Sequence, residues 1–481
     1  MVMAVIIIIA YRKGKSMAKT KKYKMDWKMM SVILALAWPT MLEQLMQTAV
    51  QYIDTAMVGT LGTYATAAVG ATGTVNWLIT SSISALSIGF LAFIAKSCGA
   101  NDKEKAQKIV AQAVTVTLIV GLFFTAATVG LSYKIPAWMK VDENIIQLAG
   151  SYFFVLYLPM LPRTASIMFG TVLRAAGDTK TPMKVGLAVN IINIILNFLL
   201  IYPTRNVSIF GISFNVFGAG WGVIGAAAAS AAAFTFGGIC ITVLLWKHPM
   251  VSPKGQSLKP DVQLLKPCLK VALPNMLQRF GTSLGYVAFA TMINSVGEVA
   301  TAAHTIANTV ESAFYIPGYG MQTAAATLSG NAYGAGDNKT MQRLAKMFIP
   351  LEIGLMAVSG IALYVAAPSL VNIFSSSEEV IQLGTKVLRM VALSEPFYGF
   401  SIIVEGLMLG VGRTKIPFLY NIIGMWGVRC AGTFICIQIF GYGLVSAWAC
   451  MIAHNIVVSV FYLISYKKGS WNPLIDTSHQ V

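Results

Sequence analysis

Pro39–Leu42 (PTML) recurs along this chain as Pro274–Leu277 (PNML), and Gly99–Asp102 (GAND) recurs as Gly334–Asp337 (GAGD). Both pairs are separated by 235 positions. One constant offset between separate stretches is very improbable by chance, so the chain is a duplication of one structural unit. Each copy is therefore expected to form the same set of elements in the same order.

The alignment of the two copies also locates their main difference. The offset of 235 carries ENIIQL at 143–148 onto EEVIQL at 378–383, whereas FGAG at 217–220 matches FGYG at 440–443 at an offset of 223. The first copy is therefore longer, and we interpret 204–215 as an insertion in an outer loop.

Composition decides the class of protein. Hydrophobic residues make up 56% of the 481 residues and charged residues only 11%, against about 25% charged in soluble globular proteins. Apolar runs of about 20 residues, enough to cross a ~30 Å hydrocarbon core, recur along the whole chain. A soluble enzyme is excluded. The net charge of +17 comes from Lys and Arg residues in the segments between the apolar runs, as is usual for membrane proteins. We therefore expect no nucleic-acid partner.

These runs predict an all-α polytopic membrane protein with twelve transmembrane helices, in two parallel six-helix repeats that form two lobes. The helices are predicted near 31–56, 64–95, 107–133, 145–174, 181–203, 217–246, 267–293, 300–330, 343–367, 380–410, 416–440 and 443–466. The predicted domains are a basic extension (1–30), an N-terminal lobe (31–246), a linker (247–266), a C-terminal lobe (267–466) and a tail (467–481). Parallel repeats are typical of transporters with a substrate path between the halves.

The distribution of Lys and Arg predicts the orientation. Outer loops hold Lys134, Lys140 and Arg205, whereas the other segments between spans are rich in cations. This bias predicts that both termini and the linker are cytoplasmic.

Polar residues inside the spans are the candidates for an ion site, because charge in a bilayer is costly. Glu43, Gln47, Gln51 and Asp54 share one face of the first helix, about 80° wide at ~100° per residue. Such a face is expected to line a wet cavity, with Asp54 binding a cation or a proton. The alternative is that Asp54 only meets outer water at the helix end.

The fifth predicted helix repeats this pattern with Asn190, Asn193 and Asn197 on one face. Amide oxygens are suitable ligands for a small cation, and amide N–H groups can stabilise a neighbouring carboxylate. Hydrogen bonding between helices is the alternative. We therefore predict a coupling-ion site at Asp54, Asn193 and Asn197.

The second copy carries different polar residues. Secondary candidates for coupling or for substrate contact are Gln278, Tyr286, His304, Asn308, Glu311 and Glu395, beside Glu43, Gln47 and Gln51 of the first copy. His304 and Glu311 are spaced for a proton relay. Arg389 is expected to reach Glu395 only across a helix break at Pro396, and Glu405 is expected to be solvated. Phe289 stands at the repeat equivalent of Asp54, so the lobes are chemically unequal.

Motifs for enzymatic catalysis are absent from the chain. It contains no Gly-x4-Gly-Lys-Ser/Thr, no His-Glu-x-x-His and no Gly-x-Ser-x-Gly. Its six cysteines have no metal or redox spacing, so we interpret them as packing thiols. We expect no enzymatic activity and no cofactor apart from a coupling ion.

Four segments carry a family resemblance. QYIDTAMVG (51–59), LRAAGDTKTP (173–182), NIILN (193–197) and AAHTIANTVESAFYIPG (302–318) resemble the multidrug and toxic compound extrusion (MATE) transporters. The resemblance implies two lobes in a V and export of amphipathic, mostly cationic compounds in exchange for H⁺ or Na⁺. It also implies a multi-pass protein of a bacterial-type plasma (inner) membrane, and we expect a monomer.

Residue by residue, the resemblance implies that Asp54 and Asn193 belong to the coupling site of the amino-terminal lobe. Asn197 stands where some members carry Asp, while Thr282 and Tyr398 stand near the acidic positions of the NorM-like branch. Na⁺ needs about five or six oxygens, which Asp54, Asn193 and Asn197 with backbone carbonyls and water would supply. Because Asn197 stands in place of that Asp, the site has one carboxylate fewer, and we favour H⁺ over Na⁺ as the coupling ion.

Two alternatives to drug efflux stay open. A flippase for lipid-linked oligosaccharides has a related fold but needs more cations in its cavity; Arg163, Arg279, Lys386, Arg389 and Arg429 are the ones near the spans. A membrane-embedded enzyme is disfavoured because no catalytic motif is present.

Overall fold

The computed structural model describes residues 26–138, 142–209 and 212–477. Nearly all of this part of the chain is helical, and one two-stranded sheet is added. The basic extension up to residue 25 lies outside the described residues, as does Lys140. A helical segment lies at each of the twelve predicted positions, so the predicted fold class is confirmed.

The helices follow the repeat. The first unit contains α2 (Trp27–Gly59), α3 (Thr63–Gly99), α4 (Lys103–Gly130), α5 (Lys134–Trp138), α6 (Glu143–Tyr157), α7 (Met160–Ala175), α8 (Lys180–Leu200) and α9 (Gly222–Lys247). The second contains α10 (Val262–Asn294), α11 (Glu298–Gly334), α12 (Asn338–Phe374), α13 (Glu378–Ala392), α14 (Glu395–Gly410), α15 (Lys415–Ile422), η1 (Ile423–Cys430), α16 (Ala431–Phe434), η2 (Ile435–Ile439) and α17 (Leu444–Lys467), and α18 (Pro473–Thr477) follows.

The repeated motif GAND/GAGD forms the same turn in both units. Asn101 (φ 57°) and Gly336 (φ 67°) both take the left-handed conformation that Asn and Gly tolerate best. The following residues, Asp102 and Asp337, cap α4 and α12 by accepting the backbone N–H of residues 105 and 340. Hydrogen bonds from Thr340 hold the pKa of Asp337 below its usual value. The motif is therefore a helix-stop and helix-start signal.

Two of the predicted spans are bent rather than straight. α6 and α7 meet at 51°, and α13 and α14 meet at 52°. Pro159 precedes the first turn of α7, and Pro396 lies in the first turn of α14. Because proline donates no backbone hydrogen bond and clashes with the preceding turn, the helix cannot continue straight through it.

Within the described ranges, eight helices are long and apolar enough to cross a membrane, and counting each bent pair as one span gives ten. The other two predicted spans are α10 and α11, which are long but carry polar stripes along one face. The chain is therefore a multi-pass membrane protein, as two apolar bundles of this length cannot be solvated by water.

The insertion in the first unit is a β-hairpin, not the loop predicted at 204–215. β1 (Pro203–Ile209) pairs antiparallel with β2 (Ile212–Ala219), with Arg205 opposite Val216. Because β2 continues to Ala219, the next helix starts at Gly222 and not at 217. Alternating β-branched residues in VSI and ISFNV explain the strands.

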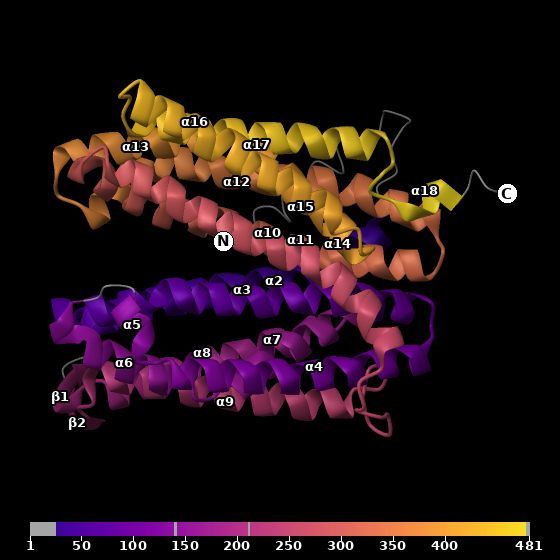
Figure 1. The fold of residues 1–481 in the computed structure, drawn as a ribbon, viewed down its shortest axis with the longest axis horizontal. Coiled ribbons are helices and arrows are strands. Elements are labelled where there is room, and N and C mark those ends of the chain that lie inside the picture. The colour runs from indigo at the N-terminus through magenta and orange to yellow at the C-terminus, as the bar shows by residue number, and fades with distance from the viewer. Residues whose placement is uncertain (1–25, 139–141, 210–211, 478–481) are drawn as a thin grey trace.

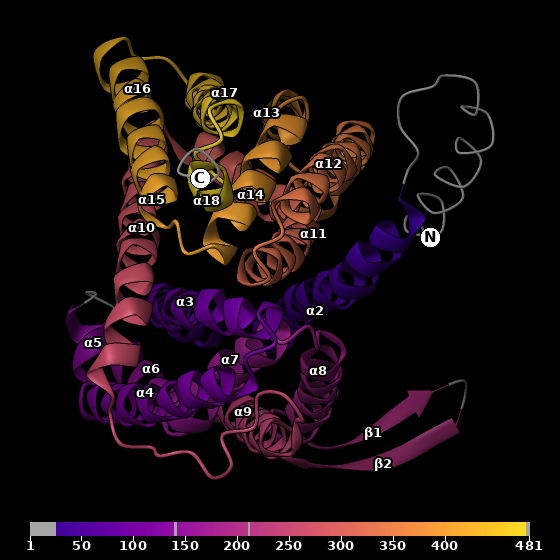
Figure 2. The same ribbon diagram turned by 90° about the vertical axis from the view of Figure 1, so that its right-hand side faces the viewer.

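The two units form two bundles that lie side by side along their length (Figures 1 and 2). The β-hairpin and α5 lie at one end, which we call the hairpin end, and the segment 248–261 joins the bundles at the other, the linker end. The first helix of each unit begins in the other unit's core. Ile33 and Ala37 of α2 pack among second-unit residues, and their repeat equivalents Cys268 and Ala272 of α10 pack among first-unit residues.

The bundles also touch closely where α3 and α11 cross at the linker end. A Cβ atom on Gly99 would overlap the carbonyl of Asn331, and one on Gly334 would overlap the carbonyl of Lys96. Gly99 and Gly334 are repeat equivalents, so the crossing follows the pseudo-two-fold symmetry. Lys96 Nζ lies 4.4 Å from the centre of the Tyr333 ring, a cation–π contact across the same crossing. Glycine therefore allows a close backbone contact that holds this end shut.

Candidate functional site

A cluster of one carboxylate and two amides joins three helices of the first unit. Asn197 on α8 donates from Nδ2 to Asp54 Oδ1 on α2 at 2.6 Å, and Asn193 lies one turn before it at 3.2 Å. Ser230 on α9 lies 3.0 Å from the Asn193 amide. The structure thus brings the three predicted coupling residues together.

The Asn193 amide satisfies more partners when its nitrogen faces Asp54. In that orientation Nδ2 donates to Asp54 Oδ1 at 2.9 Å and to Oδ2 at 3.2 Å, and Oδ1 accepts from Ser230. Amide N–H groups of Asn193 and Asn197 therefore surround an anionic Asp54 carboxylate.

Burial makes the cluster sensitive to charge. Asn197 is fully buried, and its Oδ1 has no hydrogen-bond partner among the described residues. A buried acceptor without a partner is costly, and a proton donor, a water molecule or a cation would remove that cost. The donor set of carboxylate, amide and hydroxyl oxygens fits a small hard cation such as Na⁺.

The second unit has no counterpart of this cluster. At the offset of 235 the positions of Asp54, Asn193 and Asn197 are occupied by Phe289, Val428 and Gly432. The guanidinium carbon of Arg429 lies 4.0 Å from the centre of the Phe289 ring. The predicted asymmetry is therefore visible as geometry: an acid with amides in one unit, an arginine on an aromatic ring in the other.

A cavity of about 500 Å³ lies between the bundles. Aromatic rings of the second unit form much of one wall, and its polar groups include three carboxylates and three guanidinium groups. These aromatic residues include Tyr286, Tyr315, Tyr319 and Tyr398, and the charged ones are Glu43, Glu311, Glu405, Arg174, Arg279 and Arg429. Polarisable rings beside charged groups suit an amphipathic guest.

Two of the carboxylates in this cavity have partners. Glu43 Oε2 forms an ion pair with Arg174 Nη1 at 3.1 Å, and Glu405 Oε1 accepts from Gln278 Nε2 at 2.7 Å. Glu405, which was expected to be solvated, is partly exposed and lines this cavity. The sequence did not indicate the Arg174 pair, since Arg174 ends α7 and lies far from Glu43 in the chain.

Arg429 is positioned by an irregular helix. It lies in the π-helical stretch η1, where the wider turn changes the direction of side chains, as is common at functional sites. Only 3% of Arg429 is exposed, and its guanidinium also lies 4.8 Å from the Tyr286 ring. Glu311 lines the same cavity and is buried.

The remaining secondary candidates lie in different surroundings. Gln47 and Gln51 are exposed, Asn308 is exposed toward the central cavity, and Glu395 is buried. The His304 ring packs edge-on against Phe289 and Trp448, and its Nδ1 has no hydrogen-bond partner among the described residues. The His304–Glu311 relay is therefore not formed in this state.

The predicted pair of Arg389 and Glu395 is also not formed. The helix break before Pro396 is present, but Arg389 Nε donates to the Tyr364 carbonyl at 3.4 Å instead. Glu395 lies behind Gly360 on the buried side of the bend. The bend turns the two side chains to different faces, so their spacing in sequence does not bring them together.

One buried acid was missed by sequence reasoning. Glu352 on α12 is completely buried beside Gly318 and Gly399, and neither carboxylate oxygen has a hydrogen-bond partner in the described part of the chain. The signal was present, since Glu352 is the one charged residue in the apolar run 347–374. A single charge inside a predicted span is sufficient to mark a functional candidate.

The chain is similar to known proteins both in sequence and in fold. The profile of the MatE family matches residues 39–199 and 274–435, one match in each repeat. A probable multidrug resistance protein NorM of Thermotoga maritima is 27% identical over 439 residues, covering 91% of this chain and 92% of that protein. A probable multidrug resistance protein YoeA of Bacillus subtilis is 24% identical, covering 94% of this chain and 96% of its own length.

Solved structures show the same fold. A MATE structure in complex with MaL6 superimposes with a TM-score of 0.85 at 22% identity, covering 92% of this chain and 97% of that one. An outward-facing conformation of a multidrug resistance MATE family transporter superimposes with a TM-score of 0.84, covering 92% and 96%. At this identity the superpositions establish the fold alone.

Proposed function

Because this chain belongs to the MatE family of transporters, we propose that it is a cation-coupled exporter of amphipathic, mostly cationic compounds. It is a transporter and not an enzyme. The observation that carries the proposal is the cluster of Asp54, Asn193 and Asn197, a carboxylate held by amides at the side of one bundle. Such a group changes its charge and its hydrogen bonds together.

In the proposed mechanism, ion and substrate favour opposite states of the first bundle. A proton or cation on Asp54 removes a partly buried negative charge and reorganises the hydrogen bonds of α2, α8 and α9. A transported ligand shifts the balance between states only by as much as its affinity differs between them. Export follows if the charged form of Asp54 accompanies tight binding of a cationic drug and the neutralised form accompanies release.

The central cavity supports drug export over lipid-linked oligosaccharide transport. A diphosphate substrate needs several unpaired cations facing its path. Of the five basic residues near the spans, Arg279 and Arg429 line the cavity. Arg163 instead donates hydrogen bonds to Asn76 and Thr80 inside the first bundle, at 2.8 and 3.0 Å. Lys386 and Arg389 line a separate groove. The cavity therefore combines few free cations with many aromatic rings.

The coupling ion is the first point to test, and we favour H⁺. Purified protein in liposomes is expected to export ethidium when a pH gradient is imposed in Na⁺-free buffer, because one carboxylate is enough to carry a proton. The measurement is dye fluorescence under independently imposed pH and Na⁺ gradients. Transport that is absent in Na⁺-free buffer and restored by Na⁺ would assign Na⁺ instead.

For localisation we propose the plasma membrane of a bacterial-type cell, with the linker end and both termini in the cytoplasm, and a monomer as the active form. A single cysteine at Ser257 in the linker should be labelled only after the membrane is opened. One at Ser208 in the hairpin should be labelled in intact cells, with the six native cysteines replaced in both variants. Labelling of both positions from outside would contradict this topology.

A further inference from the structure

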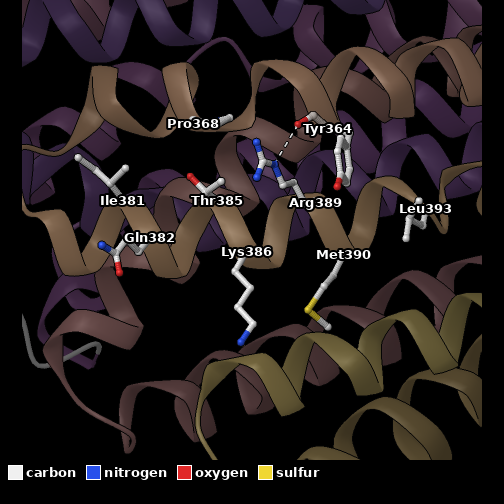
Figure 3. Close-up of a pocket in the computed structure, with 9 residues that line it drawn as sticks. All are labelled: Tyr364, Pro368, Ile381, Gln382, Thr385, Lys386, Arg389, Met390 and Leu393. Atoms are coloured by element: carbon white, nitrogen blue, oxygen red, sulfur yellow. Dashed lines mark hydrogen bonds between the residues drawn. The ribbon is translucent and has the colours of Figure 1, made fainter.

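A groove of about 600 Å³ lies between α12 and α13 on the surface of the second bundle, away from the central cavity (Figure 3). Two cations line it, Lys386 and Arg389, together with Tyr364 and apolar side chains that include Leu393. Nothing in the proposed transport mechanism uses this groove.

The two cations have no carboxylate partner. In the part of the chain that the structure describes, the ion pairs are Lys108–Glu104 and Arg174–Glu43. A cation in a membrane-spanning helix is costly unless it is paired or reaches the interface. The groove therefore presents positive charge that an anion would satisfy.

The Arg389 side chain is held in place on one side only. Its Nε donates to the Tyr364 carbonyl at 3.4 Å, and its guanidinium carbon lies 5.2 Å from the Tyr364 ring centre. The terminal nitrogens stay available, and a guanidinium fork suits a phosphate through two parallel hydrogen bonds. Figure 3 shows Arg389 turned toward α12 and Lys386, one turn earlier, extending from the other side of α13. The flexible stem of Lys386 allows its ammonium group to swing toward the groove.

The surroundings of the groove are those of a lipid-facing surface. Val365 and Leu393 are each 71% exposed, and Ile361 is 66% exposed. Arg389 lies about 17 Å along the helix from Glu378 at ~1.5 Å per residue. In a bent span of about 50 Å centred on ~30 Å of hydrocarbon, the boundary with the headgroups lies about 10 Å from Glu378, so the backbone of Arg389 lies about 7 Å inside it, a depth from which a long basic side chain reaches the headgroups.

The groove is not a requirement of the fold. The first unit has the same bent span, but Ser151 and Phe154 occupy the repeat equivalents of Lys386 and Arg389. A position that one copy fills with Ser and Phe does not need a cation for packing. The charge in the second unit therefore needs a different explanation.

We propose that this groove binds an anionic phospholipid from the leaflet at the hairpin end. The phosphate lies on the Arg389 guanidinium, Lys386 supplies the second positive charge, and the acyl chains lie along the apolar surface of α12 and α13. A lipid with net negative charge is preferred to a zwitterionic one, because a choline cation would meet two cations of the protein.

The test is lipid binding to the purified, full-length protein by native mass spectrometry. Wild-type protein is expected to bind phosphatidylglycerol about tenfold more tightly than phosphatidylcholine, about 1.4 kcal/mol. The double variant Arg389→Gln/Lys386→Gln should lose this preference. Lys134→Gln, which removes an exposed cation at the same end but outside the groove, should keep it.

Two further measurements separate the alternatives. Arg389→Lys keeps the charge but not the fork, so it should retain part of the preference even if the double variant does not fold. Inorganic phosphate at millimolar concentration should not displace the lipid. Equal preference in wild type and in a folded double variant, or full displacement by inorganic phosphate, would overturn the proposal.

Discussion

Replacing Asp54 by asparagine is expected to reduce gradient-driven drug efflux by at least ~100-fold, about 2.7 kcal/mol in the transport rate. The amide has the same size and still accepts the hydrogen bond from Asn197 Nδ2, which is 2.6 Å from Asp54 Oδ1 in the wild type. It cannot change its charge, however, so an ion gradient no longer acts on this cluster. Efflux is measured in liposomes with imposed pH and Na⁺ gradients.

The control for this variant is Glu298→Gln, which removes an exposed carboxylate at the start of α11 and should transport like the wild type. Asp54→Asn should retain the elution profile of the folded protein but bind a cationic drug more weakly, because the neutral amide corresponds to the form of Asp54 that accompanies release. Wild-type efflux by Asp54→Asn would move the coupling group elsewhere, and Glu311→Gln in the central cavity would be the next variant to measure.

Alanine at Gly99 or Gly334 is expected to open the linker end and stop transport. A Cβ at either position would overlap the backbone of the facing helix. Overpacking of this kind costs about 1–3 kcal/mol. It therefore shifts the equilibrium between the closed and the open linker end by roughly 5- to 150-fold toward the open form. Because the two positions are repeat equivalents in one contact, the double variant should show the larger shift.

Spin-label distances report this shift directly. Labels at Lys105 and Lys339, exposed near the linker end, should move apart in Gly99→Ala/Gly334→Ala. Labels at Glu143 and Glu378 near the hairpin end should not. Gly354→Ala is the matched control, since no atom lies within 4 Å of a Cβ there. Unchanged distances with normal efflux would show that this crossing does not gate transport.

The amino-acid sequence by itself determined the duplication, the positions of the twelve helical segments and the residues of the proposed coupling cluster. These follow from local periodicity: apolar runs give the length of each span, and spacings of three and four place Asp54 and the asparagines of α8 each on one helix face. The caps at Asp102 and Asp337 are local as well, because a left-handed residue followed by a capping acid ends one helix and starts the next.

Only the tertiary structure decided which faces meet. The pair of Glu43 with Arg174, the turn of Glu405 into the cavity and the separation of Arg389 from Glu395 depend on helix rotation, on bends and on packing between distant segments. A helix periodicity says that residues share a face, but not which face of which helix lies opposite. For the same reason the exchange of Ile33 and Cys268 between the two cores became visible only in the folded chain.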